Sequence, residues 1–156
     1  ALAVPTALIA KALASFRGPK GRMQRYNGIN GSVVIDDSYN ANPDSTLAAI
    51  AVLAGISGKR VLVLGDMGEL GEAAPEQHVR IGEAARAAGL ERLITLGELS
   101  EAAARAFGDS GRHFNRIEDL LAAVGPELGP DTTLLVKGSR FMRMERVVQS
   151  FKVESA

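Results

Sequence analysis

The sequence predicts an α/β fold with a mostly parallel sheet, helices on both faces of the sheet and an antiparallel hairpin at the start. Short aliphatic and β-branched runs alternate with longer segments of helical periodicity, and this alternation indicates parallel strands joined by helices. Two Asn-Gly pairs, at 27–28 and 30–31, indicate the hairpin, because this dipeptide favours the tight turns that join antiparallel strands.

The predicted elements follow one another with short connections. Residues 22–26 and 32–36 are predicted to form the two strands of the hairpin. Then come a helix over 43–56, a strand over 60–64, a helix over 75–88, a strand over 93–96, a helix around 99–106, a short strand at 113–114, a helix over 117–124, a strand over 132–136 and a helix over 144–151. This order is Rossmann-like, with strands buried between two layers of helices.

The helix over 43–56 has a clear start. Asn42 is a plausible N-cap, and Pro43 would occupy the first helical position, where its missing N–H costs nothing. The apolar face of this helix is predicted to consist of Leu47, Ile50, Ala51 and Ala54.

Residues 1–20 do not fit the alternating pattern. Helical spacing over about 5–16 is followed by Gly18 and Pro19, which break helices. A lone helix before such a break is unusual at the start of a domain, so we expect residues 1–20 to be the terminal helix and linker of a preceding domain. The domain itself is expected over 21–152, with 153–156 as a tail.

Composition excludes several classes of function. The formal net charge is zero, so nothing suggests electrostatic binding to nucleic acid or to an anionic membrane. There is no Cys, which excludes disulfides, thiolate zinc sites and a thiol nucleophile, and suits a cytoplasmic protein. No apolar run approaches the ~20 residues that a membrane span needs, so membrane insertion is not expected. With 46% hydrophobic but only 4% aromatic residues, the core must be aliphatic.

Polar residues follow the predicted strands at 36–37, 65–66, 97–98 and 137–139. Because the carboxyl ends of parallel strands meet at one edge of a sheet, we expect these segments to form a ligand site there. Asp37 is a candidate to accept hydrogen bonds from ribose hydroxyls, with loop capping or a salt bridge as the alternative. Asp36 is expected to face solvent.

Other candidates surround these acids. Asn40 and Asn42 can orient a ligand through amide donors and acceptors, or serve only as turn and cap residues. Tyr39 can pack against a base or sugar, or against the edge of the fold. Lys137 precedes a predicted helix and can attract an anion, although a surface Lys is the alternative. Arg22 is a point charge near the linker.

Several motifs are missing from the sequence. It has no His-Glu-x-x-His metal spacing, no Gly-x-Ser-x-Gly elbow and no Gly-x-x-x-x-Gly-Lys-Ser/Thr phosphate loop. If the domain binds ATP, something else must hold most of the phosphates. His78 shares a helical face with Ile81 and Ala85, so a packed, hydrogen-bonded core His is expected rather than a ligand.

Four ordered motifs resemble the C-terminal domain of the Mur ligase family. They are Gly-Arg-Met-Gln at 21–24, Asp-Asp-Ser-Tyr-Asn-Ala-Asn-Pro at 36–43, Leu-Gly-Asp-Met-Gly-Glu-Leu-Gly at 64–71 and Val-Lys-Gly-Ser-Arg at 136–140. Within this family, the absence of an Asp-Asn-Pro-Arg motif favours the branch that adds a dipeptide over the branch that adds diaminopimelate. Residues 1–16 resemble the final helix of that family's central domain.

The resemblance implies a reaction and its participants. Such enzymes use ATP to phosphorylate the carboxylate of UDP-N-acetylmuramoyl-tripeptide, and the amine of D-alanyl-D-alanine then attacks to form an amide bond in cytoplasmic peptidoglycan synthesis. The central domain would carry the phosphate loop and most of the Mg2+ site, and the N-terminal domain would hold the UDP-sugar. The C-terminal domain closes over ATP and the incoming dipeptide, so this chain alone is expected to be inactive.

The resemblance also implies roles for particular residues. Arg22 would contact phosphate during catalysis, Asp37 would bind the ribose hydroxyls, and Tyr39 and Asn40 would lie near the nucleoside. The side facing the dipeptide would be lined by Asn42, Asp66, Lys137 and Ser139. No metal ligand is implied within this domain.

Two alternatives remain open. A receiver-type signalling domain also places an acid pair, an Asp, a Thr and a Lys after successive strands, as do Asp36-Asp37, Asp66, Thr95 and Lys137. Against it, receivers lack the opening hairpin, and Thr95 precedes Leu96-Gly97 and so is not at the strand tip. The second alternative is a stand-alone nucleotide-binding module.

Overall fold

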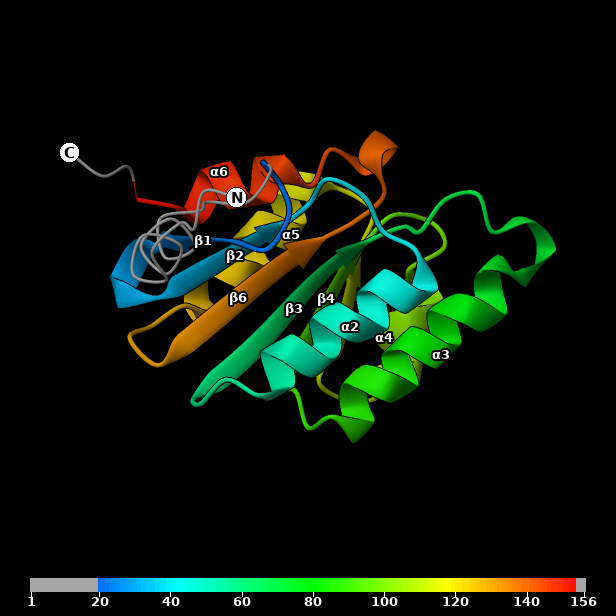
Figure 1. Cartoon of the computed structure of the whole chain (residues 1–156), viewed down its shortest axis with the longest axis horizontal. Helices are drawn as coiled ribbons and strands as arrows, with labels where there is room; N and C mark the ends of the chain where they lie inside the picture. The colour runs from blue at the N-terminus through cyan, green and yellow to red at the C-terminus, as the bar shows by residue number, and fades with distance from the viewer. Residues whose placement is uncertain (1–19, 154–156) are drawn as a thin grey trace, which may run out of the picture.

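The computed structural model describes residues 20–153, which form a six-stranded sheet covered by helices on both faces (Figure 1). The strands are β1 (Gln24–Asn27), β2 (Val33–Asp37), β3 (Lys59–Gly65), β4 (Arg92–Leu96), β5 (Gly111–Phe114) and β6 (Thr132–Lys137). The α-helices are α2 (Pro43–Ala54), α3 (Ala74–Ala87), α4 (Glu101–Phe107), α5 (Ile117–Val124) and α6 (Glu145–Phe151). The expected terminal helix over 5–16 lies outside the described residues.

The strand order across the sheet is β1-β2-β6-β3-β4-β5. Only β1 and β2 are antiparallel, joined by a turn in which Asn30 and Gly31 have φ of 55° and 77°. This is the left-handed region that Asn and Gly tolerate best, so the Asn-Gly signal for the hairpin is confirmed. All other neighbouring pairs are parallel, which confirms the Rossmann-like prediction.

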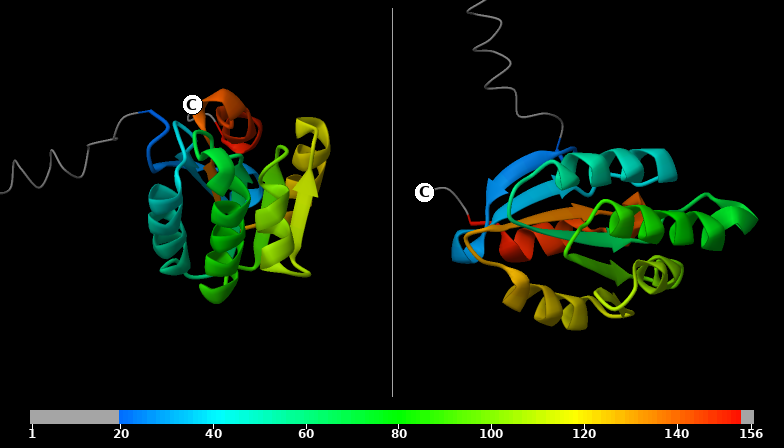
Figure 2. Two further views of the ribbon diagram at one scale, coloured as in Figure 1. Left: turned by 90° about the vertical axis from the view of Figure 1, so that its right-hand side faces the viewer. Right: turned by 90° about the horizontal axis from the view of Figure 1, so that it is seen from below.

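Alternate residues of the central strands build two separate cores. In β3, Leu62 and Leu64 pack with α2, α3 and α4, whereas Val61 and Val63 pack with α5 and α6. Figure 1 shows α2 and α3 in front of the sheet and α5 and α6 behind it, and Figure 2 shows the same layers edge-on. The near-continuous aliphatic strands are therefore explained by burial on both faces.

The helix predicted over 43–56 ends at Ala54, and its predicted apolar face is partly wrong. The buried residues are Thr46, Ala49, Ile50 and Leu53, whereas Ala51 is exposed. Aliphatic residues lie on all sides of α2, so their spacing does not define which side meets the sheet. In α4 the buried residues are Ala103, Ala104 and Phe107, whereas Leu99, which was predicted for the apolar face of this helix, lies before its start and is exposed.

His78 is a core residue, as the sequence predicted. Its side chain is fully buried, its Nε2 accepts a hydrogen bond of 3.0 Å from Met67 N–H, and its Nδ1 lies 2.7 Å from the Ala74 carbonyl. These two partners define a neutral ring with the proton on Nδ1, and they join α3 to the loop after β3.

The amino-terminal ends of the parallel strands β3 and β4 carry ion pairs. Glu127 accepts hydrogen bonds from Lys59 and from Arg92 (3.1 Å); burial raises its pKa, but these two cations outweigh burial and hold the pKa below 4.5. The hydrogen bond from Arg60 likewise lowers the pKa of Glu91. Within residues 20–153, no helix is long and apolar enough to cross a bilayer.

Candidate functional site

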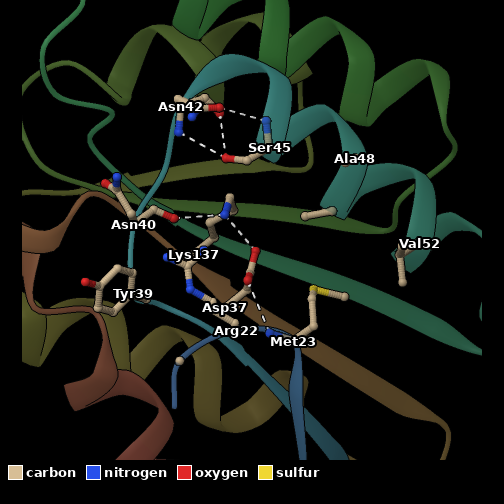
Figure 3. Close-up of a pocket in the computed structure, with 12 residues that line it drawn as sticks. Arg22, Met23, Asp37, Tyr39, Asn40, Asn42, Ser45, Ala48, Val52 and Lys137 are labelled. Carbon is tan, nitrogen blue, oxygen red and sulfur yellow. Dashed lines mark hydrogen bonds and ion pairs between the residues drawn. The ribbon is translucent and has the colours of Figure 1, made fainter. Parts of the chain in front are cut away.

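The carboxyl ends of β2 and β6 border a pocket of about 370 Å3 beside the first turns of α2 (Figure 3). It is lined by Gly21, Arg22, Met23, Asp37, Tyr39, Asn40, Asn42, Ser45, Ala48, Ala49, Val52 and Lys137. We call it the strand-end pocket. It brings together the three residues that were predicted for a nucleoside and Arg22, as expected for strands that end at one edge of a sheet.

Asp37 is the last residue of β2 and faces this pocket. Its Oδ2 accepts a hydrogen bond of 2.6 Å from Lys137 Nζ, and its Oδ1 accepts one of 3.2 Å from Met23 N–H. A carboxylate has about four lone-pair positions, so each oxygen retains capacity for a ligand hydroxyl. The side chain is 13% exposed, which makes it accessible from the pocket while shielding its hydrogen bonds.

Lys137 is not a surface residue, and its ammonium is already paired with a carboxylate instead of being available to an anion. Its side chain is only 3% exposed, and its ammonium also donates a hydrogen bond of 2.9 Å to the Asn40 carbonyl. Residues 37 and 137 are direct partners in the parallel pairing of β2 with β6, which explains how the two side chains meet. The sequence reasoning missed this pair, because β2 and β6 are far apart in the chain.

Arg22 lies between two backbone contacts to the end of β2. Gly21 accepts a hydrogen bond of 3.0 Å from Tyr39 N–H, and Met23, with φ of 50°, donates to Asp37. The guanidinium of Arg22 stacks on the Tyr39 ring, 4.5 Å from its centroid, and that of Arg140 lies 5.9 Å from it. Tyr39 is 47% exposed, so it offers Arg22 an open aromatic platform.

Asn42 is the N-cap of α2, as predicted. Its side-chain oxygen accepts a hydrogen bond of 2.8 Å from Ser45 N–H, and Ser45 Oγ accepts one of 3.1 Å from Asn42 N–H, forming a reciprocal capping box. The Asn40 side chain accepts a hydrogen bond of 2.9 Å from Ala41 N–H. Both amides therefore shape the loop that borders the pocket.

The expectation that Asp36 faces solvent is wrong. Its side chain is 3% exposed, and its Oδ1 accepts hydrogen bonds from Ser38 N–H (3.0 Å) and Ser38 Oγ (2.6 Å). The strand continues through Asp37, one residue beyond its predicted end, and alternation along it turns Asp36 toward the face of α6 and Asp37 toward the face of α2.

Asp66 and Ser139 hold strand-end loops together. The Asp66 carboxylate accepts three backbone hydrogen bonds of 2.8–3.1 Å from residues 98–100, at the start of α4. Ser139 Oγ accepts a hydrogen bond of 2.7 Å from Gly68 N–H and donates one of 3.1 Å to the Ala41 carbonyl. Asp66 lies outside the described pockets, whereas Ser139 lines a neighbouring one.

That neighbouring pocket, of about 320 Å3, lies between the loops after β2, β3 and β6. It is lined by Asn40, Ala41, Asn42, Gly68, Glu69, Leu70, Ser139, Arg140 and Phe141. We call it the loop pocket. Asn40 and Asn42 line both pockets, so the two cavities share a wall.

The apolar side of the strand-end pocket was not predicted. Met23, Ala48 and Val52 line it, and Met23 and Val52 are 40% and 50% exposed. The sequence carries no clear signal for this apolar side, because aliphatic residues lie on all sides of α2. Within 20–153, no three His, Cys, Asp or Glu side chains are placed to share one metal ion.

Most of the chain is similar to known proteins. The family model described as "Mur ligase, glutamate ligase domain" matches residues 21–140. The UDP-N-acetylmuramoyl-tripeptide--D-alanyl-D-alanine ligase of Escherichia coli K12 is 40% identical over 146 residues, which cover 92% of this chain and 32% of the relative. The enzyme of the same name from Bacillus subtilis 168 is 33% identical, over 90% and 32% of the two chains.

Solved structures agree with these sequence matches. MurF ligase from Thermotoga maritima in complex with ADP superposes with a TM-score of 0.75 at 29% identity, covering 88% of this chain and 31% of the other. MurF from Acinetobacter baumannii superposes with a TM-score of 0.79 at 30% identity, covering 94% and 34%. This chain thus spans about a third of the length of the relatives it matches.

Proposed function

The chain belongs to the Mur ligase family, and from this premise we propose that it is the C-terminal domain of an ATP-dependent ligase that adds D-alanyl-D-alanine to UDP-N-acetylmuramoyl-tripeptide. In this proposal the domain closes over ATP and the incoming dipeptide, while the N-terminal and central domains of the same polypeptide supply the UDP-sugar site and the phosphate loop. The reaction would belong to peptidoglycan synthesis in the cytoplasm.

The observation that carries the proposal is the strand-end pocket with Asp37 at its base. An acid at the end of a strand is the usual acceptor for ribose hydroxyls in nucleotide-binding α/β folds. The apolar wall of Met23, Ala48 and Val52 suits the flat face of a base. The related MurF ligase from Thermotoga maritima was solved in complex with ADP, which supports nucleotide binding by an enzyme of this kind.

Arg22 is proposed to meet the phosphates. Its guanidinium is presented at the rim of the pocket by the Tyr39 ring. Arginine forms strong charge-assisted hydrogen bonds with phosphate, and such bonds help most where negative charge shifts during transfer. Arg22 is therefore the residue of this domain that we propose to act in catalysis.

The metal that ATP brings is proposed to lie mainly on the central domain. The described residues do not group three or more metal-binding side chains at any point, so they do not fit a resident Mg2+ site. Binding of the nucleoside in the strand-end pocket requires none, because Asp37 and the apolar wall are sufficient for it.

For the dipeptide we propose the loop pocket, with Asn42 and Ser139 on its wall. Arg140 lies there too and offers a charge for a carboxylate such as the dipeptide's C-terminus. Asp66 was assigned to this side from the resemblance, but its carboxylate is taken up by three backbone N–H groups at α4. A role in holding that loop suits it better.

The alternatives are not favoured. A receiver-type domain is unsupported by the family match, and Asp66, which would be its phosphorylated residue, is 6% exposed and fully engaged. A stand-alone module would not account for relatives three times as long.

The test is dipeptide-dependent phosphate release from ATP and UDP-N-acetylmuramoyl-tripeptide. The full-length polypeptide that carries this domain should show it, and the 156-residue chain alone should match the blank without protein. Release that responds equally to glycine, or to no amine at all, would count against a dipeptide ligase. Turnover by the 156-residue chain would contradict the proposed division of labour.

A further inference from the structure

Lys137 has a place in the site that differs from the one its sequence context implies. The resemblance assigned it to the incoming dipeptide, but its ammonium points into the strand-end pocket, not the loop pocket (Figure 3). It lies 2.6 Å from Asp37 Oδ2 and 2.9 Å from the Asn40 carbonyl, and the side chain is almost completely buried.

We propose that Lys137 is a positioning residue for the nucleotide, which holds the Asp37 carboxylate and the Asn40 loop in the arrangement that receives the ribose. The proposal rests on the proposed function of the strand-end pocket. It removes Lys137 from the dipeptide side and gives it an indirect part in ATP binding.

The geometry supports positioning in three ways. First, the Asp37 carboxylate is held from both sides, by Lys137 at Oδ2 and by Met23 N–H at Oδ1, so its plane is defined before a ligand arrives. A group held in place in advance loses less conformational freedom on binding.

Second, the Asn40 contact joins the acid to the loop that leads into α2. Lys137 donates to a backbone carbonyl there, so the contact does not depend on the identity of the Asn40 side chain. One ammonium thus sets the distance between the end of β2 and the wall that both pockets share.

Third, the charge balance argues against a phosphate-binding or dipeptide-binding Lys. At 2.6 Å from a carboxylate, in a site that is 3% exposed for Lys137 and 13% for Asp37, the ammonium is already neutralised by its partner. An anionic ligand would have to compete with Asp37 for it. Arg22, stacked on an exposed ring, carries no such partner among the ion pairs described for residues 20–153.

A double-mutant cycle in the full-length ligase separates these roles. The variants are Asp37→Asn, Lys137→Met and the double variant, each measured for kcat and for the KM of ATP and of D-alanyl-D-alanine. If Lys137 acts through Asp37, each single change raises the KM for ATP about tenfold and the double change also raises it about tenfold, because coupled residues are not additive. The KM for the dipeptide should stay within about twofold in all three.

The matched control is Lys59→Met. Lys59 also forms an ion pair with a carboxylate, Glu127, but it lies at the first residue of β3, at the opposite edge of the sheet. Thermal melts of both Lys variants report any general loss of stability. A general loss would lower the concentration of active enzyme in both variants without changing either KM, so the split between the two KM values isolates positioning.

Four results would overturn the proposal. An effect of Lys137→Met that adds to that of Asp37→Asn, giving about a hundredfold rise in the KM for ATP, would mean that Lys137 contacts the nucleotide itself. A rise confined to the KM for the dipeptide would restore the earlier assignment. An unchanged KM for ATP in Lys137→Met, with a raised KM in Asp37→Asn, would exclude the positioning role of Lys137 but not the nucleotide pocket. An unchanged KM for ATP in both variants would exclude nucleotide binding in the strand-end pocket as well.

Discussion

Asp36 and Asp37 are adjacent in the chain, yet their carboxylates lie on opposite faces of the sheet and have different partners. Asp36 is buried and accepts a hydrogen bond from Ser38, whereas Asp37 accepts a hydrogen bond from Lys137 and lines the strand-end pocket. The pair therefore supplies its own control, because the same chemical change at the two positions should affect different properties.

The first prediction uses this pair. Asp37→Ala in the full-length ligase should raise the KM for ATP about tenfold or more, since the loss of a charge-assisted hydrogen bond of ~1.5 kcal/mol corresponds to about that factor. Asp36→Asn should leave the KM for ATP unchanged and lower the thermal midpoint, because it weakens buried hydrogen bonds to Ser38. Steady-state kinetics and thermal melts of both variants are the measurements. Equal KM values for Asp37→Ala and wild type, with an intact fold, would contradict the placement of the nucleoside.

The second prediction concerns the platform under Arg22. Arg22→Ala should lower kcat more than it changes the KM for ATP, because phosphate charge shifts most in the transition state. Tyr39→Phe keeps the aromatic face and should have little effect, whereas Tyr39→Leu should reproduce part of the Arg22→Ala loss in kcat. The rate of phosphate release in a single turnover, compared between Tyr39→Phe and Tyr39→Leu, is the measurement. A loss in Tyr39→Phe as large as in Tyr39→Leu would point to the hydroxyl instead of the ring.

The third prediction concerns Asn42. Asn42→Ala removes the N-cap of α2 and one half of the capping box, so the free energy of unfolding should fall by about 1 kcal/mol. Asn42→Asp keeps the acceptor oxygen and should be nearly neutral. Urea unfolding of the 156-residue chain measures both. Asn42→Asp also discriminates a ligand role: if the KM for the dipeptide rises while stability is retained, Asn42 does more than cap the helix.

The fourth prediction is a pH dependence at the far edge of the sheet. The pKa of Glu127 is lowered, because the hydrogen bonds of Lys59 and Arg92 outweigh the effect of burial. A carboxylate with a lowered folded-state pKa contributes stability above its unfolded-state pKa, and that contribution disappears as the pH falls through the folded-state pKa. The stability difference between wild type and Glu127→Gln should therefore be largest near neutral pH and shrink below 4.5.

Urea unfolding at a series of pH values checks this. Glu118→Gln is the control, because Glu118 forms an exposed ion pair of 3.5 Å with Arg116 and such pairs contribute little. A difference for Glu127→Gln that stays constant down to the lowest pH would show that the carboxylate charge is not what stabilises this edge.

The elements of this fold were predictable from the sequence because they depend on local signals. The Asn-Gly pairs, the Asn42 cap with Pro43 and the buried aliphatic strands each act over a few residues. Asn42 is the clearest case, since its cap and the start of α2 agree to the residue.

What could not be predicted depends on contacts between distant strands. The partner of Asp37 is 100 residues away, and it is found only once β6 is known to lie between β2 and β3. The direction of Asp36 required the true end of β2, which lies one residue beyond the predicted end. The buried side of α2 was ambiguous because Ala is small enough to lie on either side of a helix.

The pairing of β2 with β6 has a consequence for how this domain can change over generations. Residues 37 and 137 face each other at the end of a five-residue strand, and successive side chains of that strand alternate between faces. Loss of one codon within 33–35 would preserve both acids and the reading frame, yet it would tend to exchange the surroundings of the two carboxylates. Selection for the site should therefore act on the length of this strand as well as on the identity of its residues. Deletions that shorten the strand should be selected against even where each remaining residue is unchanged.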